Sequence, residues 1–140
     1  MRNLELARDH LTRAQARLLA LDVLFDAQSW ADVVRESQEV VELTLKGLLR
    51  AYGVEPPRIH DVSPVLVAER DRLPPALRPE VPTLCDASRR LRRDRELAFY
   101  GAEDLTPSGF YGRADAHEAR ETARRIVALV EPHVRAVDGN

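Results

Sequence analysis

The sequence has almost none of the residues that hold small domains together through covalent or metal links. Cys85 is the only cysteine among the 140 residues, so the chain cannot contain a disulfide framework or a cysteine-based zinc site. The four histidines are scattered, and no carboxylates accompany them at the spacing of a metal site. We therefore expect no metal ion and no cofactor, with Cys85 as a small core residue.

Long apolar runs and the common catalytic loops are also missing. No stretch of about 18 consecutive apolar residues occurs, which predicts that no segment crosses a membrane. The N-terminal stretch MRNLELARDH is charged and lacks the apolar core of a secretion signal, so the expected location is the cytoplasm. The sequence contains no G-x-x-x-x-G-K-[S/T] loop, no G-x-G-x-x-G loop and no G-x-S-x-G elbow.

Charge is abundant in this chain but nearly balanced. Hydrophobic residues make up 44% of the sequence and charged residues 31%, which is typical of a globular protein. We expect residues 1–140 to form a single domain. The formal net charge of −2 argues against a protein that binds nucleic acid over its whole surface, but it is compatible with a local basic patch.

Apolar residues recur every three or four positions along most of the chain, which predicts helices and no sheet. The predicted helices cover residues 3–24, 30–52, 62–72, 83–99 and 115–137. The inward residues of the last helix are predicted to be Ala116, Ala119, Ala123, Ile126, Val127, Val130 and Val134. The expected fold is all-α, an antiparallel up-and-down bundle of four to five helices.

The stretch RRLRRDRELAFYG, residues 89–101, holds five arginines in seven residues and then becomes apolar. Leu91 and Ala98 mark the inward face of the predicted helix, and Arg95 interrupts that face. A charged side chain on an inward face lowers the stability of the fold unless it forms an ion pair or binds a ligand or partner. Two interpretations follow: Arg95 forms a salt bridge, or Arg95 faces a phosphate or a partner in a cleft.

In the phosphate-binding interpretation, the guanidinium of Arg95 donates two parallel hydrogen bonds to phosphate oxygens. Arg92 and Arg93 flank Arg95 and enlarge the cationic surface, while Phe99 and Tyr100 line the inner wall of the cleft. In the salt-bridge interpretation, a carboxylate holds Arg95 and the other arginines are solvated.

His60 and Asp61 follow two prolines and are the second group of residues that could carry out chemistry. A histidine–aspartate pair can serve in a metal phosphohydrolase, but such a site needs further histidines and aspartates at metal-binding spacing, which are missing here. We therefore expect Asp61 to cap the third helix and His60 to anchor the loop.

Three segments together resemble the HEPN domain family. They are SQEVVELTLKGLLRAYGVEPPRIHDVSPVL (residues 37–66), RELAFYG (95–101) and AEDLTPSGFYGRADAHEARETARRIVALV (102–130). The resemblance extends over about residues 3–137. The order of the segments and the gaps between them also agree with the family, which makes the resemblance specific. It implies an all-α bundle that forms a homodimer and binds RNA or nucleotides. It also implies a minimal nucleotidyltransferase partner in a toxin–antitoxin pair.

Many members of the family are metal-independent ribonucleases, with an arginine followed after four to six residues by a histidine at the end of the fourth helix. Arg93 and Arg95 match that arginine, whereas Phe99 and Tyr100 stand at the histidine positions. Phenylalanine cannot transfer a proton, and free tyrosine titrates at about 10. The resemblance implies a degenerate ribonuclease with Arg95 and Tyr100 as catalytic candidates. From the interrupted apolar face, we expect Arg92, Arg93, Arg95 and Phe99 to form a nucleotide- or RNA-binding set. The alternative is a non-catalytic helical dimer that serves as a protein-interaction module.

Overall fold

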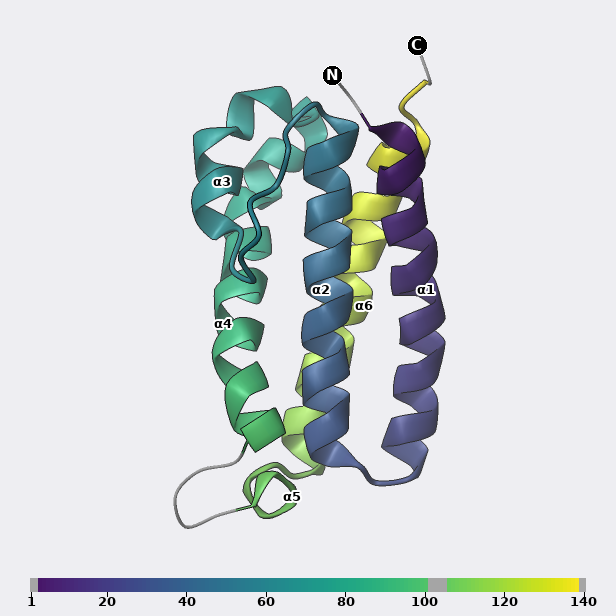
Figure 1. Cartoon of the computed structure of the whole chain (residues 1–140), viewed down its shortest axis with the longest axis vertical. Helices are drawn as coiled ribbons and strands as arrows, with labels where there is room; N and C mark the ends of the chain where they lie inside the picture. The colour runs from purple at the N-terminus through teal and green to yellow at the C-terminus, as the bar shows by residue number, and fades with distance from the viewer. Residues whose placement is uncertain (1–2, 101–105, 139–140) are drawn as a thin grey trace.

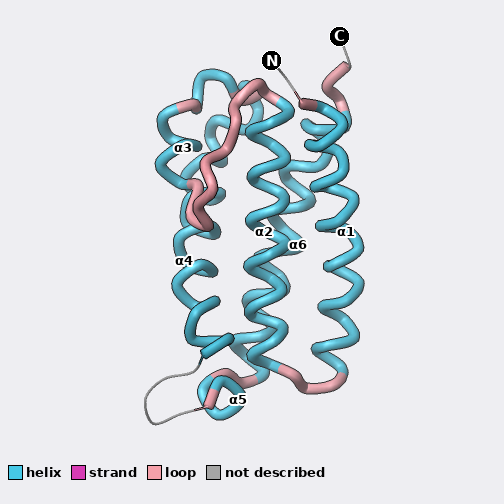
Figure 2. The backbone as a smooth tube through the Cα atoms, in the orientation of Figure 1, coloured by secondary structure: helices cyan, strands magenta, loops and turns pink. Residues whose placement is uncertain are grey.

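The computed structural model describes the backbone of residues 3–100 and 106–138 and the side chains of residues 3–90 and 106–138. Four long helices lie side by side and alternate in direction (Figure 1). They are α1 (Leu4–Asp26), α2 (Trp30–Ala51), α4 (Val81–Tyr100) and α6 (Arg113–Arg135). The shorter elements are α3 (Ser63–Ala68), α5 (Pro107–Phe110) and two 3-10 segments, Arg70–Arg72 and Pro75–Glu80. The described backbone contains no strand (Figure 2), and the predicted all-α, up-and-down bundle is confirmed.

Helix α2 is the central element of the bundle and packs against α1, α4 and α6. Its apolar face is wide, and Val33, Val41, Leu45 and Leu48 are fully buried there. The residues predicted to point inward from α6 are all buried: Ala116, Ala119, Ala123, Ile126, Val127, Val130 and Val134. Truncating one large aliphatic side chain in such a core to alanine costs about 2–5 kcal/mol.

Helices α1 and α2 approach each other closely at Gly47. A Cβ atom at this position would lie 2.6 Å from Leu11 Cδ2 and 3.1 Å from the carbonyl oxygen of Ala7. Leu11 and Ala7 are both fully buried, so neither can move into solvent. Glycine inside a helix costs about 1 kcal/mol relative to alanine. The close approach of the two helices explains its presence here.

Local side-chain chemistry sets the ends of the long helices. The Oδ1 atom of Asn3 accepts the N–H of Leu6 at 3.2 Å and caps α1. Helix α4 begins at Val81, two residues before the predicted start at residue 83. Pro82 fits in the first turn, because the N–H groups of a first turn have no partner within the helix and proline lacks this group.

No helix in the described ranges combines the length and the apolar character needed to span a membrane.

The segment predicted as a third helix over residues 62–72 is broken in two. Helix α3 ends at Ala68 and a 3-10 turn follows at Arg70–Arg72, after which the chain turns so that Leu73 enters the core. The predicted cap is also displaced by one residue, because Val62 is the N-cap of α3 and Asp61 precedes it. Asp61 still accepts the backbone N–H of Ser63 at 3.0 Å, and it therefore stabilises the first turn from outside the helix.

Candidate functional site

The arginine run, residues 89–95, occupies the middle of α4. The predicted site residues on this helix are Arg92, Arg93, Arg95, Phe99 and Tyr100. Their side chains lie outside the described residues, so the phosphate-binding and salt-bridge interpretations of Arg95 both stay predictions. The side chains of Arg89 and Arg90 are described and show how the run begins.

Arg89 and Arg90 are neighbours in the chain but have different environments. Arg90 Nη2 donates a hydrogen bond to Glu118 Oε1 and ties α4 to α6. Arg89 is exposed and forms no ion pair with any residue in the described part of the chain. The start of the run therefore contains one arginine that stabilises helix packing and one whose guanidinium faces solvent.

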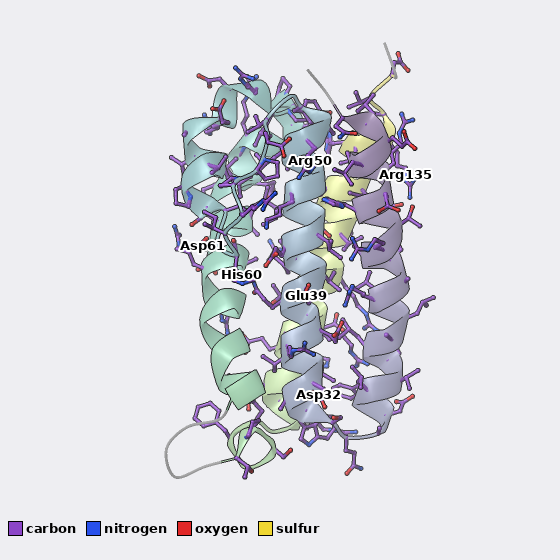
Figure 3. The ribbon with its side chains drawn as sticks, in the orientation of Figure 1. Asp32, Glu39, Arg50, His60, Asp61 and Arg135 are labelled. Carbon is purple, nitrogen blue, oxygen red and sulfur yellow. The ribbon has the colours of Figure 1, made fainter. Side chains whose placement is uncertain are left out.

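The loop between α2 and α3 is fixed to α4 through Asp61 (Figure 3). Its Oδ1 atom accepts hydrogen bonds from Ser63 N at 3.0 Å, Ser63 Oγ at 2.7 Å and Ser88 Oγ at 3.0 Å. Ser88 Oγ in turn accepts the N–H of Val62 at 3.1 Å. Burial alone would raise the pKa of Asp61. The hydrogen bonds from Ser63 and Ser88 and the charge of Arg89 outweigh burial and leave the pKa below its usual value.

His60 connects the same loop to α2. Its Nδ1 atom lies 2.6 Å from Glu42 Oε1, and Glu42 Oε2 lies 3.3 Å from Lys46 Nζ. Figure 3 shows His60 in the loop, next to α2. Within the described ranges, no three histidine, cysteine, aspartate or glutamate residues come together as a metal site. The contact with Glu42 agrees with the predicted role of His60 as a loop anchor.

Cys85 lies under this loop on α4. Its side chain is buried, and Sγ lies 3.6 Å from the carbonyl oxygen of Ser63. Burial raises the pKa of the Cys85 thiol, which disfavours the nucleophilic thiolate. Cys85 is therefore a core residue, as the sequence predicts.

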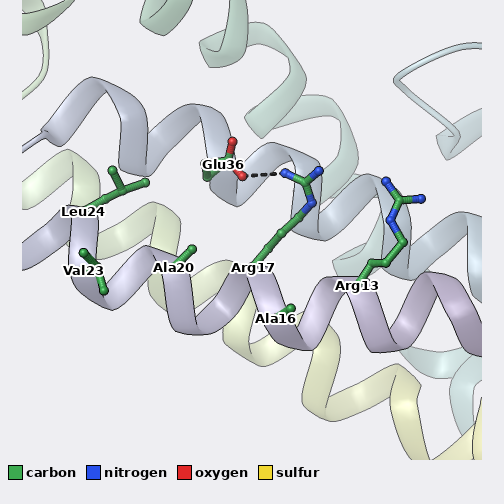
Figure 4. A pocket seen from close by; sticks show the side chains of 7 residues that line it. All are labelled: Arg13, Ala16, Arg17, Ala20, Val23, Leu24 and Glu36. Atoms are coloured by element: carbon green, nitrogen blue, oxygen red, sulfur yellow. Dashed lines mark hydrogen bonds and ion pairs between the residues drawn. The ribbon is translucent and has the colours of Figure 1, made fainter.

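A groove of about 660 Å³ runs between α1 and α2 on the outside of the bundle (Figure 4). Its lining residues are Arg13, Ala16, Arg17, Ala20, Val23, Leu24 and Glu36. Arg17 Nη1 lies 2.7 Å from Glu36 Oε2, so the one carboxylate of the groove is already engaged. The remaining surface is mainly small and apolar, and it offers no pair of groups for acid–base chemistry.

A second pocket, which the sequence analysis did not predict, lies between α1 and α6. Phe25, Arg113, Ala114, His117 and Arg120 line it, and we refer to it as the α1/α6 pocket. The sequence contains one feature that could have indicated this pocket, the spacing of Arg113, His117 and Arg120. Residues that are four and then three positions apart share one face of a helix. The sequence alone could not show that an aromatic ring from α1 completes this face.

The fold and the arginine run define a small helical-bundle protein with a basic segment on α4, the third of its long helices. The sequence model of the HEPN domain matches residues 7–133 of the chain. The chain therefore belongs to the HEPN domain family, as its sequence segments suggested.

Two solved structures are similar to this chain over nearly its whole length. TT1696 from Thermus thermophilus is 27% identical, and the match covers 91% of this chain and 97% of that one, with a TM-score of 0.72. ST0689, described as an archaeal HEPN homologue, is 24% identical, and the match covers 96% of this chain and 99% of that one, with a TM-score of 0.71. Both structures agree with the helical bundle found here. No curated protein matches the chain.

Proposed function

We propose that this HEPN-family protein binds RNA or nucleotides through the arginine run of α4, and that it does so as a single-domain cytoplasmic homodimer. The observation that carries the proposal is the run of five arginines between Arg89 and Arg95 in a chain with a net charge of −2. Guanidinium groups are suited to phosphate because they donate two parallel hydrogen bonds. The solvent-facing Arg89 supports the proposal, since no described carboxylate forms an ion pair with it.

Within this site, Arg95 contacts phosphate, Arg92 and Arg93 add positive charge, and Phe99 and Tyr100 form the inner wall. RNA cleavage by the ribose 2′-hydroxyl needs a cation for the charge that develops on the phosphate and a group that transfers a proton. Arg95 supplies the cation. Tyr100 is the only one of the two residues at the histidine positions that carries a proton to transfer. We accordingly assign at most a weak, metal-independent ribonuclease activity, with no cofactor.

The family resemblance also suggests a partner, a minimal nucleotidyltransferase that acts with this protein as toxin and antitoxin. A gene for such an enzyme beside this one, and a complex that survives size-exclusion chromatography after co-expression, would support this part of the proposal. Separate elution of the two proteins would count against it.

A second candidate function is a non-catalytic helical dimer that docks another protein. The ion pair between Arg90 and Glu118 favours it, because at least one arginine of the run serves helix packing. If Arg95 is held in the same way, its replacement leaves a carboxylate stranded and costs about 3–5 kcal/mol of stability.

One variant separates the two functions. If Arg95 contacts phosphate, Arg95→Ala should melt near the wild-type temperature and bind a fluorescently labelled single-stranded RNA about ten to a hundred times more weakly. Arg125→Ala is the matched control, because Arg125 is an exposed arginine on α6 and the variant has the same net charge. A large loss of melting temperature with unchanged RNA binding would reject the phosphate site in favour of the interaction module.

A further inference from the structure

The α1/α6 pocket is a second basic site on the molecule, and none of its lining residues belongs to the arginine run. It has a volume of about 520 Å³. Arg113, His117 and Arg120 face α1, whereas Glu118 faces the other way and bonds Arg90 of α4. The pocket therefore opens on a different side of α6 from Glu118 and its partner Arg90.

Two aromatic rings hold the guanidinium of Arg113 at the edge of this pocket. The rings of Phe25 and Trp30 pack edge to face, with centroids 5.0 Å apart and an angle of 67°. The Cζ atom of Arg113 lies 5.5 Å from the Phe25 centroid and 5.6 Å from the Trp30 centroid. These distances are typical of cation–π contacts, which position a guanidinium without using its N–H donors.

The N–H donors of Arg113 are not used by the rest of the described chain. Arg113 forms no hydrogen bond or ion pair through its side chain with any residue that the structure describes. Arg120 is different: its Cζ lies 3.8 Å from the Phe25 centroid, but its Nη1 donates to Asp22 Oδ1 at 3.1 Å. Asp22 Oδ1 also accepts a hydrogen bond from Arg124 Nη2 at 2.5 Å, so Arg120 shares this carboxylate with a second arginine. Arg113 has no ion-pair partner among the described residues.

The other walls of the pocket are suited to an anion with an organic group attached. No carboxylate is among the described residues that line the pocket, and His117 adds ring nitrogens one turn after Arg113. The His117 ring also packs edge to face against Phe25, with centroids 6.4 Å apart. Phe25 and the small side chain of Ala114 supply the apolar surface. A cation, a nearby imidazole and an aromatic wall in about 520 Å³ match the size and chemistry of one nucleotide.

We propose that the α1/α6 pocket binds a 5′-phosphorylated nucleotide. The phosphate accepts hydrogen bonds from Arg113 and His117, and the sugar and base lie against Phe25 and Ala114. The nucleotide is either free in solution or the 5′-terminal residue of an RNA strand, since both present the same phosphate and base. This site does not depend on the function proposed for α4, because the two sites share no residue.

Trp30 makes the proposal directly measurable. It is the only tryptophan in the chain, and it contacts both Phe25 and Arg113. Adenosine 5′-monophosphate should change the Trp30 fluorescence in a saturable way, inorganic phosphate more weakly, and adenosine not at all at the same concentration. Competition by a short oligoribonucleotide with a 5′-phosphate, and not by the same strand with a 5′-hydroxyl, would identify a strand end as a ligand. Competition by neither strand would restrict the site to free nucleotides.

Arg113→Ala should weaken adenosine 5′-monophosphate binding by about ten- to a hundredfold, and Arg113→Lys should weaken it less. Arg125→Ala, an exposed arginine on the same helix, should leave binding unchanged. Isothermal calorimetry measures the same affinities without relying on fluorescence, and circular dichroism checks that each variant is folded.

Calorimetry with no binding heat at millimolar adenosine 5′-monophosphate would overturn the proposal. Equal weakening by Arg113→Ala and Arg125→Ala would also overturn it, because the attraction would then be nonspecific. Arg95→Ala should leave the Trp30 signal intact while it weakens RNA binding to α4. Failure of this pocket and failure of the α4 site are therefore distinguishable.

Discussion

Replacing Asp61 by alanine tests whether the His60–Asp61 pair is structural, as the geometry indicates. The variant removes one acceptor that serves three hydrogen bonds, from Ser63 N, Ser63 Oγ and Ser88 Oγ. Ser88 is 1% exposed, so its hydroxyl cannot exchange the lost bond for water. Each such bond contributes about 1 kcal/mol net, and the sum for Asp61→Ala is about 2–3 kcal/mol.

Thermal denaturation followed by circular dichroism measures this loss. For a chain of this size, about 2–3 kcal/mol corresponds to a fall in Tm of about 5–10 °C. Asp61→Asn keeps an acceptor oxygen in the same place and should lose clearly less. Asp71→Ala is the matched control, because Asp71 is exposed and its side chain makes no described hydrogen bond, so its Tm should change little. A Tm for Asp61→Ala within about 1 °C of wild type would refute the assignment of Asp61 as the anchor of this loop.

Three further outcomes follow from the described contacts. The pKa of the Asp61 carboxyl is lower in the folded than in the unfolded protein. The ionised carboxylate therefore contributes its full stabilisation above about pH 4, and this stabilisation is lost as the pH falls through the folded pKa. In melting experiments at decreasing pH, the Tm difference between wild type and Asp61→Asn should shrink over that range. Gly47→Ala gains about 1 kcal/mol of helix propensity, but the clash of the new methyl group with Leu11 costs more than this gain. Chemical denaturation should therefore show a net loss of stability of up to about 2 kcal/mol. A stabilised variant would contradict the close contact of α1 with α2. The buried thiol of Cys85 should react with an aromatic disulfide reagent at least about a hundredfold more slowly than free cysteine and at the full rate in denaturant; rapid reaction in the native protein would contradict its burial.

Periodicity predicted the long helices well because their inward faces are uniform. The alanines and valines of α6 repeat without interruption, and every one of the predicted inward residues is buried. The third predicted helix failed because its end is set by tertiary packing. Leu73 and Leu77 lie beyond it and are 1% exposed, and the chain leaves the helix after Ala68 to bury them.

The same distinction holds for the candidate sites. The sequence shows the arginine run directly, since its members are adjacent. It could not show that Arg90 is paired with Glu118, because the two residues are 28 positions apart and meet only when α4 packs against α6. The α1/α6 pocket was even harder to foresee from the sequence. The guanidinium of Arg113 on α6 is held there by Phe25 of α1 and Trp30 of α2, which meet only in the folded bundle. Such sites follow from the packing of helix ends, which periodicity does not specify.

The most direct test of the central claim is the salt dependence of RNA binding by the variant with Arg92, Arg93 and Arg95 all replaced by alanine. Each phosphate contact with single-stranded RNA contributes about 0.7 to the slope of log affinity against log salt concentration. Loss of the Arg95 contact should lower the magnitude of the slope by about 0.7, and loss of the charges of Arg92 and Arg93 as well brings the decrease to at most about 2, together with a large loss of affinity at low salt. An affinity and a slope equal to those of the wild-type protein would show that the α4 arginines do not bind RNA phosphate.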